Sequence, residues 1–221
     1  MTAQAGGAST LASLRDMRRR LRALRCNLPP AERSAAERAI RAGLRRFGLW
    51  QACRRVAVYI GMPGEVDLRP SFDDAWRNGV QLYVPRIVHR RSGAMAFVPL
   101  APAAVMRKNS FGIAEPAGGC RGRIPTLWLD AIVVPLVGFD RSGHRLGMGA
   151  GFYDRALRRR LDRTQSFRRP LLIGVAYSIQ EVERIEPAPW DVALDFVVTE
   201  RGVRRFDSRQ LEETKPCSTG S

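Results

Sequence analysis

Apolar residues recur at helical spacing in two segments near the beginning of the chain. In residues 10–25, arginines occupy the face opposite the apolar positions Leu11, Leu14, Met17, Leu21 and Leu24. Pro29-Pro30 interrupts this pattern, and residues 31–47 predict a second helix that Gly48 ends. Residues 1–9 are small and polar, so we expect them to be disordered.

Short apolar runs typical of buried strands alternate with helical patterns along the rest of the chain. The strand-like runs cover residues 56–60, 80–84, 94–98, 131–137, 171–176 and 194–199. Helical patterns cover residues 68–78 and 153–161, whereas residues 99–128 are rich in Pro, Gly and Ala and predict loop. This alternation indicates βαβ units. We therefore predict an α/β fold, a single three-layer domain over residues 10–200 with a mainly parallel β-sheet flanked by helices.

Length and hydropathy narrow the class of protein. The chain has 221 residues, which suits one well-buried α/β domain. It contains no apolar run approaching the roughly 18 residues of a membrane span, and its first ten residues lack the apolar centre of a signal peptide. We expect a cytoplasmic protein with no membrane partner. Residues 201–221 are polar and predict a disordered C-terminal tail.

The chain is strongly basic, with a net charge of +16 and a pI of about 11.3. Lysine occurs only at Lys108 and Lys215, so arginine carries nearly all of this charge. GC-rich coding is one explanation, and a nucleic-acid-binding surface is the other. The arginines are spread over many segments without an RNA-binding aromatic signature, so we expect no specific nucleic acid partner. A basic surface would still attract polyanionic substrates.

Cysteine and histidine give no metal motif. Cys26, Cys53, Cys120 and Cys217 form no C-x-x-C pair, and the two histidines, His89 and His144, lie far apart in the sequence. Structural zinc needs clustered Cys and His ligands, so reduced, unpaired thiols are the better interpretation.

The densest cluster of chemistry is the run from Arg145 to Asp154, RLGMGAGFYD. It follows the apolar run 131–137 and precedes the helical pattern 153–161. Backbone N–H groups in a glycine loop, followed by a helix N-terminus, can hold phosphate oxygens. Arg145 can clamp a phosphate, and Asp154 can reach a magnesium ion bound to it.

Known nucleotide motifs do not explain this run. The Walker A pattern is absent, and Phe152 stands where the dinucleotide fingerprint requires a third glycine. A flexible surface loop, with Asp154 as a plain helix N-terminal acid, is the alternative interpretation.

Three further groups are candidates. The turn 61–67, GMPGEVD, could present Glu65 to the N–H groups of a heterocycle beside Tyr59, Ile60 and Met62, or it could be a plain strand-to-helix turn. Asp191 and Asp195 could complete a magnesium site with Asp154. The arginines of the first helix could contact a triphosphate, although a solvated helix face is common; these are Arg15, Arg18 and Arg19.

These motifs, in this order, resemble the 5-formyltetrahydrofolate cyclo-ligase family. The resemblance runs from about residue 11 to 200 and is most specific in residues 134–140, VPLVGFD, in residues 143–154 and in residues 191–200, DVALDFVVTE. It implies an enzyme that converts 5-formyltetrahydrofolate to 5,10-methenyltetrahydrofolate. Phosphorylation of the formyl oxygen and attack by N10 would drive the reaction, with release of ADP and phosphate. The substrates would be 5-formyltetrahydrofolate and ATP, and Mg²⁺ would be the cofactor.

The resemblance also implies roles for individual residues, with Arg145 as the catalytic residue. Asp154 and Asp195 match the family's magnesium carboxylates. Its folate-binding positions correspond to Tyr59, Ile60, Met62, Glu65 and Phe111. Its ATP-binding positions correspond to Leu14, Arg15, Arg145, Leu146, Gly147, Met148, Gly149, Ala150, Gly151, Phe152 and Tyr153.

The chain departs from the family pattern at a few positions. Leu11 stands where many members have a lysine that contacts ATP, and Ala150 and Trp190 replace a frequent lysine or glycine and a frequent histidine. The arginine, the glycines and the paired aspartates remain. We expect a monomer. The alternatives are a nucleotide-binding relative that acts on another substrate and a basic RNA-binding module of the same fold.

Overall fold

A computed structural model of the chain describes residues 4–89, 92–109, 112–161 and 169–206. The helices are α1 (Gln4–Cys26), α2 (Pro30–Arg46), α3 (Leu49–Ala52), α4 (Phe72–Arg77) and α5 (Phe152–Leu161), with the 3-10 turns η1 (Arg69–Ser71), η2 (Thr126–Trp128) and η3 (Ser178–Gln180). The strands of the main sheet are β1 (Arg55–Ala57), β2 (Gln81–His89), β3 (Ala94–Leu100), β6 (Ala131–Pro135), β9 (Leu171–Val175), β10 (Phe196–Thr199) and β11 (Gly202–Arg205). Two small hairpins pair β4 (Met106–Lys108) with β5 (Ala114–Pro116), and β7 (Gly138–Phe139) with β8 (Arg145–Leu146).

The main sheet has the order β11-β10-β9-β6-β1-β2-β3. The five inner strands, from β10 to β2, are parallel, and β11 and β3 are antiparallel edge strands. The predicted mainly parallel sheet is therefore confirmed. Numbered by chain position, the parallel strands follow the doubly wound order 2-1-3-4-5. In such sheets ligands bind beyond the carboxyl ends of the strands where the winding reverses, which here lies between β1 and β6.

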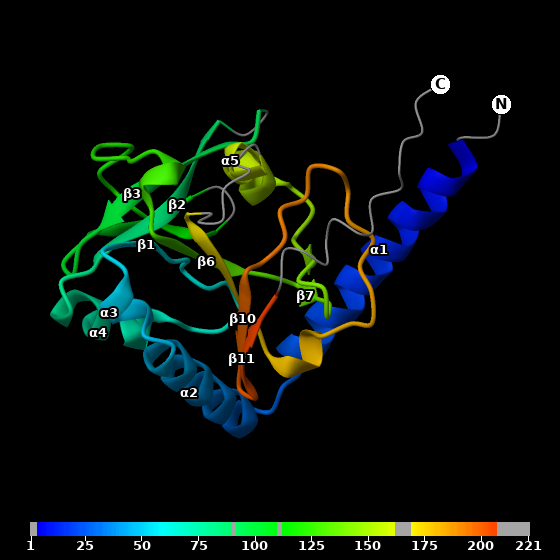
Figure 1. Cartoon of the computed structure of the whole chain (residues 1–221), viewed down its shortest axis with the longest axis horizontal. Coiled ribbons are helices and arrows are strands. Elements are labelled where there is room, and N and C mark those ends of the chain that lie inside the picture. The colour runs from blue at the N-terminus through cyan, green and yellow to red at the C-terminus, as the bar shows by residue number, and fades with distance from the viewer. Residues whose placement is uncertain (1–3, 90–91, 110–111, 162–168, 207–221) are drawn as a thin grey trace.

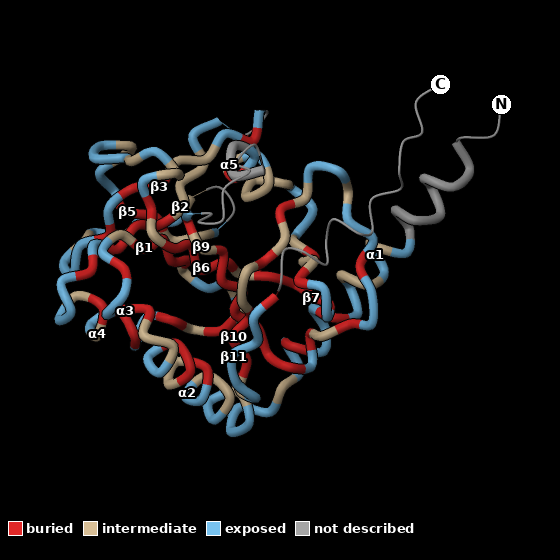
Figure 2. The backbone as a smooth tube through the Cα atoms, in the orientation of Figure 1, coloured by how far each residue is buried: buried red, intermediate tan, exposed pale blue. Residues whose placement is uncertain are grey.

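Side chains alternate between two hydrophobic cores on the two faces of this sheet, as the strand period of two requires. Val56 and Val133 point to the face that α2, α3 and α4 cover, whereas Ala57 and Ile132 point to the face that α5 covers. The cartoon shows α2 and α5 on opposite sides of the strands, and the most buried backbone follows the strands between them (Figures 1 and 2). The predicted three layers are confirmed.

Helix α1 lies beside the sheet and contacts η3 (Figure 1). Its buried Leu21 packs with Val137, Leu146, Val182 and Ile185, so α1 also covers the β7–β8 hairpin. The helix begins at Gln4, so the expected disorder of residues 1–9 is corrected for residues 4–9. This extension, QAGGAS, contains no proline, but Gly6 and Gly7 have low helix propensity, so its composition alone did not predict helix.

The region between residues 80 and 128 contains more strand than we predicted. Strand β2 continues through Pro85, where we predicted its end. The Val58 amide, directly after β1, donates a hydrogen bond to the Tyr83 carbonyl, so the backbone groups of Tyr83 point toward β1. Two residues further along the strand, Pro85 points to the same side, but β1 has already ended there. The missing N–H of proline therefore disrupts no strand pairing. The predicted loop 99–128 also contains β4, β5 and η2.

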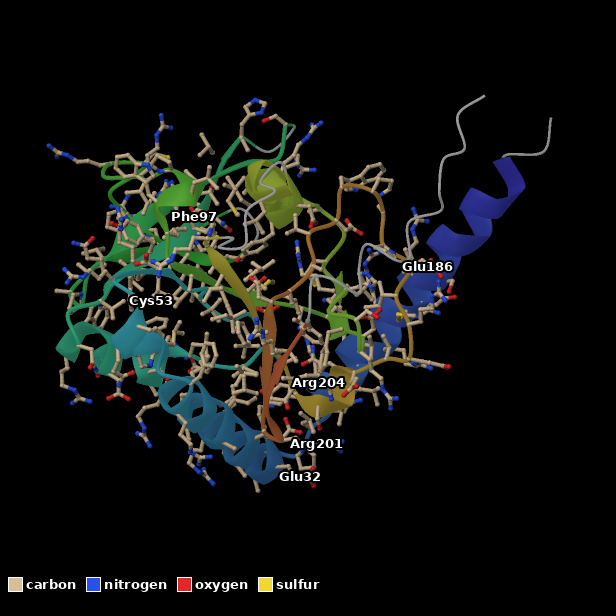
Figure 3. The ribbon with its side chains drawn as sticks, in the orientation of Figure 1. Glu32, Cys53, Phe97, Glu186, Arg201 and Arg204 are labelled. Atoms are coloured by element: carbon tan, nitrogen blue, oxygen red, sulfur yellow. The ribbon has the colours of Figure 1, made fainter. Side chains whose placement is uncertain are left out.

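The expected tail after residue 200 begins with an ordered strand. Strand β11 pairs antiparallel with β10, and Arg204 forms ion pairs with Glu181 at 2.8 and 3.1 Å. Figure 3 shows Arg201 and Arg204 on this outer hairpin. The buried Phe206 anchors its end, so the prediction of disorder is wrong for residues 202–205. Residues 207–221 lie outside the described part. No helix in the described ranges is long and apolar enough to cross a membrane.

Candidate functional site

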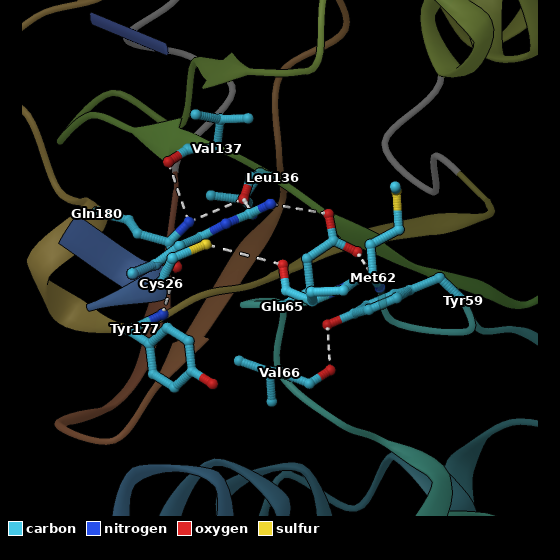
Figure 4. Close-up of polar contacts among 11 residues, drawn as sticks. Cys26, Tyr59, Met62, Glu65, Val66, Leu136, Val137, Tyr177 and Gln180 are labelled. Carbon is cyan, nitrogen blue, oxygen red and sulfur yellow. Dashed lines mark hydrogen bonds and ion pairs between the residues drawn. The ribbon is translucent and has the colours of Figure 1, made fainter. Parts of the chain in front are cut away.

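The turn after β1 places Glu65 at the point where the winding of the sheet reverses. Its side chain is 7% exposed, and its Oε2 accepts a hydrogen bond of 3.0 Å from the Met62 amide. Its Oε1 lies 3.2 Å from Nη2 of Arg25, a buried residue in the last turn of α1. Glu65, Met62 and Tyr59 lie together in Figure 4. The structure therefore presents a buried carboxylate beside an aromatic ring, which suits the N–H groups of a flat heterocycle.

Two tyrosines connect this carboxylate to the glycine loop. Tyr59 is buried and donates a hydrogen bond of 3.0 Å to the Val66 carbonyl. Burial first, and then the negative charge of Glu65, raise the pKa of Tyr59 well above its ordinary value. The same two causes raise the pKa of Tyr153, in the first turn of α5. Both phenols lie within electrostatic range of Glu65, one after β1 and the other at the start of α5.

The glycine loop has the backbone conformation that only glycine adopts without strain. Gly149 has φ of 95° and Gly151 has φ of 64°, both in the left-handed region. Helix α5 begins directly afterwards at Phe152. The Gly147 carbonyl accepts a hydrogen bond of 2.9 Å from Nε of Arg18, which ties the loop to α1. The loop amides and the helix N-terminus thus form a potential anion site.

Arg145 forms the charged centre of the loop. Its guanidinium pairs with Oδ1 of Asp154 and donates to the Val192 carbonyl. The side chains of Arg145 and Asp154 are 7% and 24% exposed, so the cation is nearly enclosed while the carboxylate remains accessible. Two residues that were each predicted to belong to the site therefore meet across the glycine loop.

The segment around Val192 brings a further carboxylate to this pair. The pKa of Asp191 is raised, chiefly by burial and further by the negative charge of Asp154, although a hydrogen bond from the Ala188 amide opposes both. Magnesium is bound through one or two carboxylates together with phosphate oxygens and water, so Asp154 and Asp191 fit such an ion. In the described part of the chain, no group of three or more His, Cys, Asp or Glu side chains forms a metal cage.

Asp195 lies where β10 begins, at the edge of the sheet where the parallel strands start. Its Oδ2 accepts a hydrogen bond of 2.6 Å from the Leu172 amide, and its own amide donates to the Leu172 carbonyl at 2.9 Å. This arrangement pins the start of β10 to β9. The structure thus gives Asp195 a part in strand pairing. Its role as a magnesium ligand stays a prediction.

A basic cleft opens between α1 and the glycine loop. It has a volume of about 690 Å³, and its lining residues are Arg15, Arg18, Arg19, Arg22, Ala23, Cys26, Met148 and Gly149. Four guanidinium groups beside a glycine loop favour a ligand with several negative charges. Arg15, predicted to contact ATP, lines this cleft.

Other predicted residues are placed differently. The side chains of Leu14 and Leu146 pack in the core between α1 and the β7–β8 hairpin, so only their backbones can face a ligand. Ile60 packs against the core beneath α2. Phe111 lies outside the described residues.

Three residues of the site escaped the sequence prediction: Arg25, Gln180 and Asp140. Arg25 was placed among the arginines opposite the apolar face of residues 10–25, yet it is 3% exposed, whereas Leu24, one of the predicted apolar positions, is 46% exposed. One signal was available, because Arg25 continues the buried stripe of Leu14, Met17 and Leu21 at helical spacing. Gln180 belongs to no local pattern that marks it, whereas Asp140 ends the run 134–140 that carries the family resemblance but was given no role of its own.

Asp140 fixes the hairpin that carries Arg145. It is 2% exposed, and its carboxylate accepts hydrogen bonds from the amides of Ser142, His144 and Ile185 at 2.9 to 3.0 Å and from Nδ1 of His144 at 3.0 Å. Burial raises the pKa of Asp140, but the bonds from His144 and Ile185 outweigh it, so the pKa lies below its ordinary value of 3.8. The ionised carboxylate is therefore part of the folded hairpin.

We expect Asp140→Asn to lower the free energy of unfolding by about 3 kcal/mol at neutral pH, because an amide nitrogen would face buried donors. The folded state lowers the pKa of Asp140, so this contribution is complete above pH 3.8 and is lost as the pH falls through the folded pKa. Urea unfolding between pH 3 and 7 measures it. Asp16→Asn, on a side chain that is 65% exposed, is the control. If the free energies of unfolding of wild type and Asp140→Asn differ by the same amount over this whole pH range, the lowered pKa of Asp140 in the folded state would be contradicted.

Comparison with known proteins places this site in a family. The family model of 5-formyltetrahydrofolate cyclo-ligase matches residues 11–200. The 5-formyltetrahydrofolate cyclo-ligase of Haemophilus influenzae is 31% identical over 178 residues, which are 80% of this chain and 92% of the relative. The enzyme of the same name from Escherichia coli K12 is 37% identical over 145 residues, 65% and 76% of the two chains. The NMR structure of Aquifex aeolicus 5,10-methenyltetrahydrofolate synthetase superposes with a TM-score of 0.73 at 31% identity, covering 94% of this chain and 96% of that one.

Proposed function

The chain belongs to the 5-formyltetrahydrofolate cyclo-ligase family, and we propose that it uses MgATP to cyclise 5-formyltetrahydrofolate to 5,10-methenyltetrahydrofolate, releasing ADP and phosphate. One observation carries the ATP part of this proposal. Helix α1 joins the two parts of the site: its Arg25 pairs with Glu65, its Arg18 donates to the Gly147 carbonyl, and its Cys26 contacts the Pro63 carbonyl and lines the basic cleft together with Gly149. A phosphate-binding loop and a carboxylate suited to the pterin ring therefore lie next to each other.

The reaction needs a phosphoryl donor because the formamide carbon is a poor electrophile and its oxygen is a poor leaving group. In the proposed mechanism the formyl oxygen attacks the γ-phosphorus of ATP, and the bond to the β–γ bridging oxygen breaks, releasing ADP. N10 then attacks the activated formyl carbon and loses its proton. Cleavage of the carbon–oxygen bond expels phosphate and leaves the methenyl bridge between N5 and N10.

Phosphoryl transfer asks the protein mainly for alignment and for stabilisation of negative charge. Arg145 would contact the transferring phosphoryl group, and the amides from Leu146 to Tyr153 would hold the phosphates. Arg15 and the other guanidinium groups of the basic cleft would bind the remaining charge of the triphosphate. Glu65, with Tyr59, Ile60 and Met62 beside it, would orient the pterin.

Asp154 would hold Mg²⁺ together with phosphate oxygens, and the family resemblance adds Asp195. The ion would neutralise charge on the phosphates as the phosphoryl group transfers. We include Asp191 as a further carboxylate at this end of the site, because it directly precedes Val192, whose backbone contacts Arg145 and Asp154. The accessible position of Asp154 at the start of α5 supports this assignment.

Coupled release of products tests the proposal. We expect one ADP and one phosphate for each methenyl product, and no ATP hydrolysis without the folate. ATP hydrolysis that ignores the folate would favour a nucleotide-binding relative with another substrate. RNA binding that weakens steeply with increasing salt concentration would favour the other alternative, a basic RNA-binding module.

A further inference from the structure

Arg25 is a buried cation between two strands of the site. It lies in the last turn of α1 and is 3% exposed. Its Nη1 donates a hydrogen bond of 3.1 Å to the Leu136 carbonyl, directly after β6, and its Nη2 lies 3.2 Å from Oε1 of Glu65, in the turn after β1. One guanidinium fork therefore joins the ends of the two strands between which the winding reverses.

The surroundings of Arg25 are built from polar groups. The Leu136 carbonyl also accepts a hydrogen bond of 2.8 Å from Nε2 of the buried Gln180. Arg25, Glu65, Gln180 and the ring of Tyr59 lie close together around a gap that is too small to hold a water molecule. Nε of Arg25 is buried and makes no hydrogen bond within the described residues. Gln180 and Tyr59 lie around Glu65 in Figure 4.

A stability role alone explains this arrangement poorly. A buried ion pair contributes little net stability compared with apolar side chains of similar volume, because both charges lose their hydration. The buried stripe of α1 uses Leu14, Met17 and Leu21 at its other positions. An arginine at the fourth position is therefore better explained by its partner, the carboxylate that the proposed function assigns to the folate.

We propose that Arg25 is a positioning residue for the folate substrate, which acts by holding the Glu65 carboxylate toward the pterin site. This inference rests on the proposed function. Arg25 binds Oε1 while the Met62 amide binds Oε2, so the carboxylate is held from both sides. Helix α1 also contacts the glycine loop through Arg18, so one helix braces both substrate sites.

Steady-state kinetics of four variants test the inference: Arg25→Met, Arg25→Lys, Glu65→Gln and the double variant Arg25→Met/Glu65→Gln. We expect Arg25→Met to raise KM for 5-formyltetrahydrofolate about 10- to 100-fold, the effect of one charged hydrogen bond, while KM for ATP stays nearly constant. Arg25→Lys should recover part of the loss, because an ammonium keeps the charge but lacks the fork. The double variant should resemble Glu65→Gln alone, because the two residues act as one unit.

Arg20→Met is the matched control, because Arg20 lies on the exposed side of the same helix. The inference would be overturned if the effects of Arg25→Met and Glu65→Gln on KM for 5-formyltetrahydrofolate were additive in the double variant. It would also be overturned if Arg25→Met changed KM for ATP as much as KM for 5-formyltetrahydrofolate. If Arg25→Met does not fold, Arg25→Lys is used for the test, and its change in KM for 5-formyltetrahydrofolate is compared with its change in KM for ATP. Absence of turnover in the wild type would contradict the proposed function instead, so the two failures are distinguishable.

Discussion

Replacing Arg145 by alanine is expected to lower kcat/KM for 5-formyltetrahydrofolate by about 1,000-fold, the scale at which an arginine stabilises a transferring phosphoryl group. The side chain is nearly enclosed and its guanidinium faces the accessible carboxylate of Asp154. Its charge therefore acts where the phosphates would lie. Arg145→Lys should restore little activity, because a lysine keeps the charge but cannot contact Asp154, the Val192 carbonyl and a phosphate with one planar fork.

Arg141→Ala is the matched control, since Arg141 belongs to the same hairpin region but its side chain is 86% exposed. Initial rates and thermal unfolding should be measured on all three variants. Arg145→Ala with near-normal turnover would refute the assignment of Arg145. A loss of turnover accompanied by an unfolded protein would point to a structural role, which Arg145→Lys separates from the catalytic one.

The second large effect is expected for Asp154→Asn, which should lower kcat/KM by about 100-fold or more and raise the Mg²⁺ concentration needed for half-maximal activity. The substitution keeps the size of the side chain. It also keeps an oxygen that can accept a hydrogen bond from the Val192 amide, which in the wild type lies 3.5 Å from Oδ1 of Asp154. The substitution removes the negative charge and replaces one carboxylate oxygen with an NH2 group, which cannot bind a metal ion. Loss of magnesium affinity is therefore the expected cause, and titration of Mg²⁺ at saturating ATP measures it.

Asp73→Asn serves as the control for Asp154→Asn. Asp73 is an exposed acid in the first turn of α4, so it matches Asp154 in its place on a helix but lies in no site. Its magnesium requirement and rate should match the wild type. An unchanged magnesium requirement in Asp154→Asn would show that Asp154 does no more than pair with Arg145.

The inner strands of the sheet were predictable because their chemistry is local. The runs around Val56, Ile132 and Val197 are apolar on both sides, as strands buried on two faces must be. The placement of Arg145 and Asp154 in one site was also predictable, since they lie nine positions apart at the two ends of one loop. Edge elements were harder: β11 depends on pairing with β10 and on the burial of Phe206, neither of which its own polar sequence reveals.

The interior of the site depends on contacts between distant segments. Arg25 meets Glu65 across 40 residues and Leu136 across 111, and Gln180 reaches the same carbonyl across 44. In the sequence, Arg25 is one of many arginines on a basic helix. Its helical spacing from Leu14, Met17 and Leu21 is the one local signal, and the packing of α1 against η3 and the β7–β8 hairpin shows that this stripe is buried. Tertiary packing, which local pattern does not encode, decides which charged residue lies inside.

The most direct measurement is absorbance of the methenyl product in a series of reactions that each omit one component. The protein, 5-formyltetrahydrofolate, ATP and Mg²⁺ together should give a steady rise in absorbance, and omission of any one of them should abolish it. A rise that persists without ATP would contradict the phosphorylation of the formyl oxygen. No rise from folded protein with all components present would contradict the cyclo-ligase activity itself.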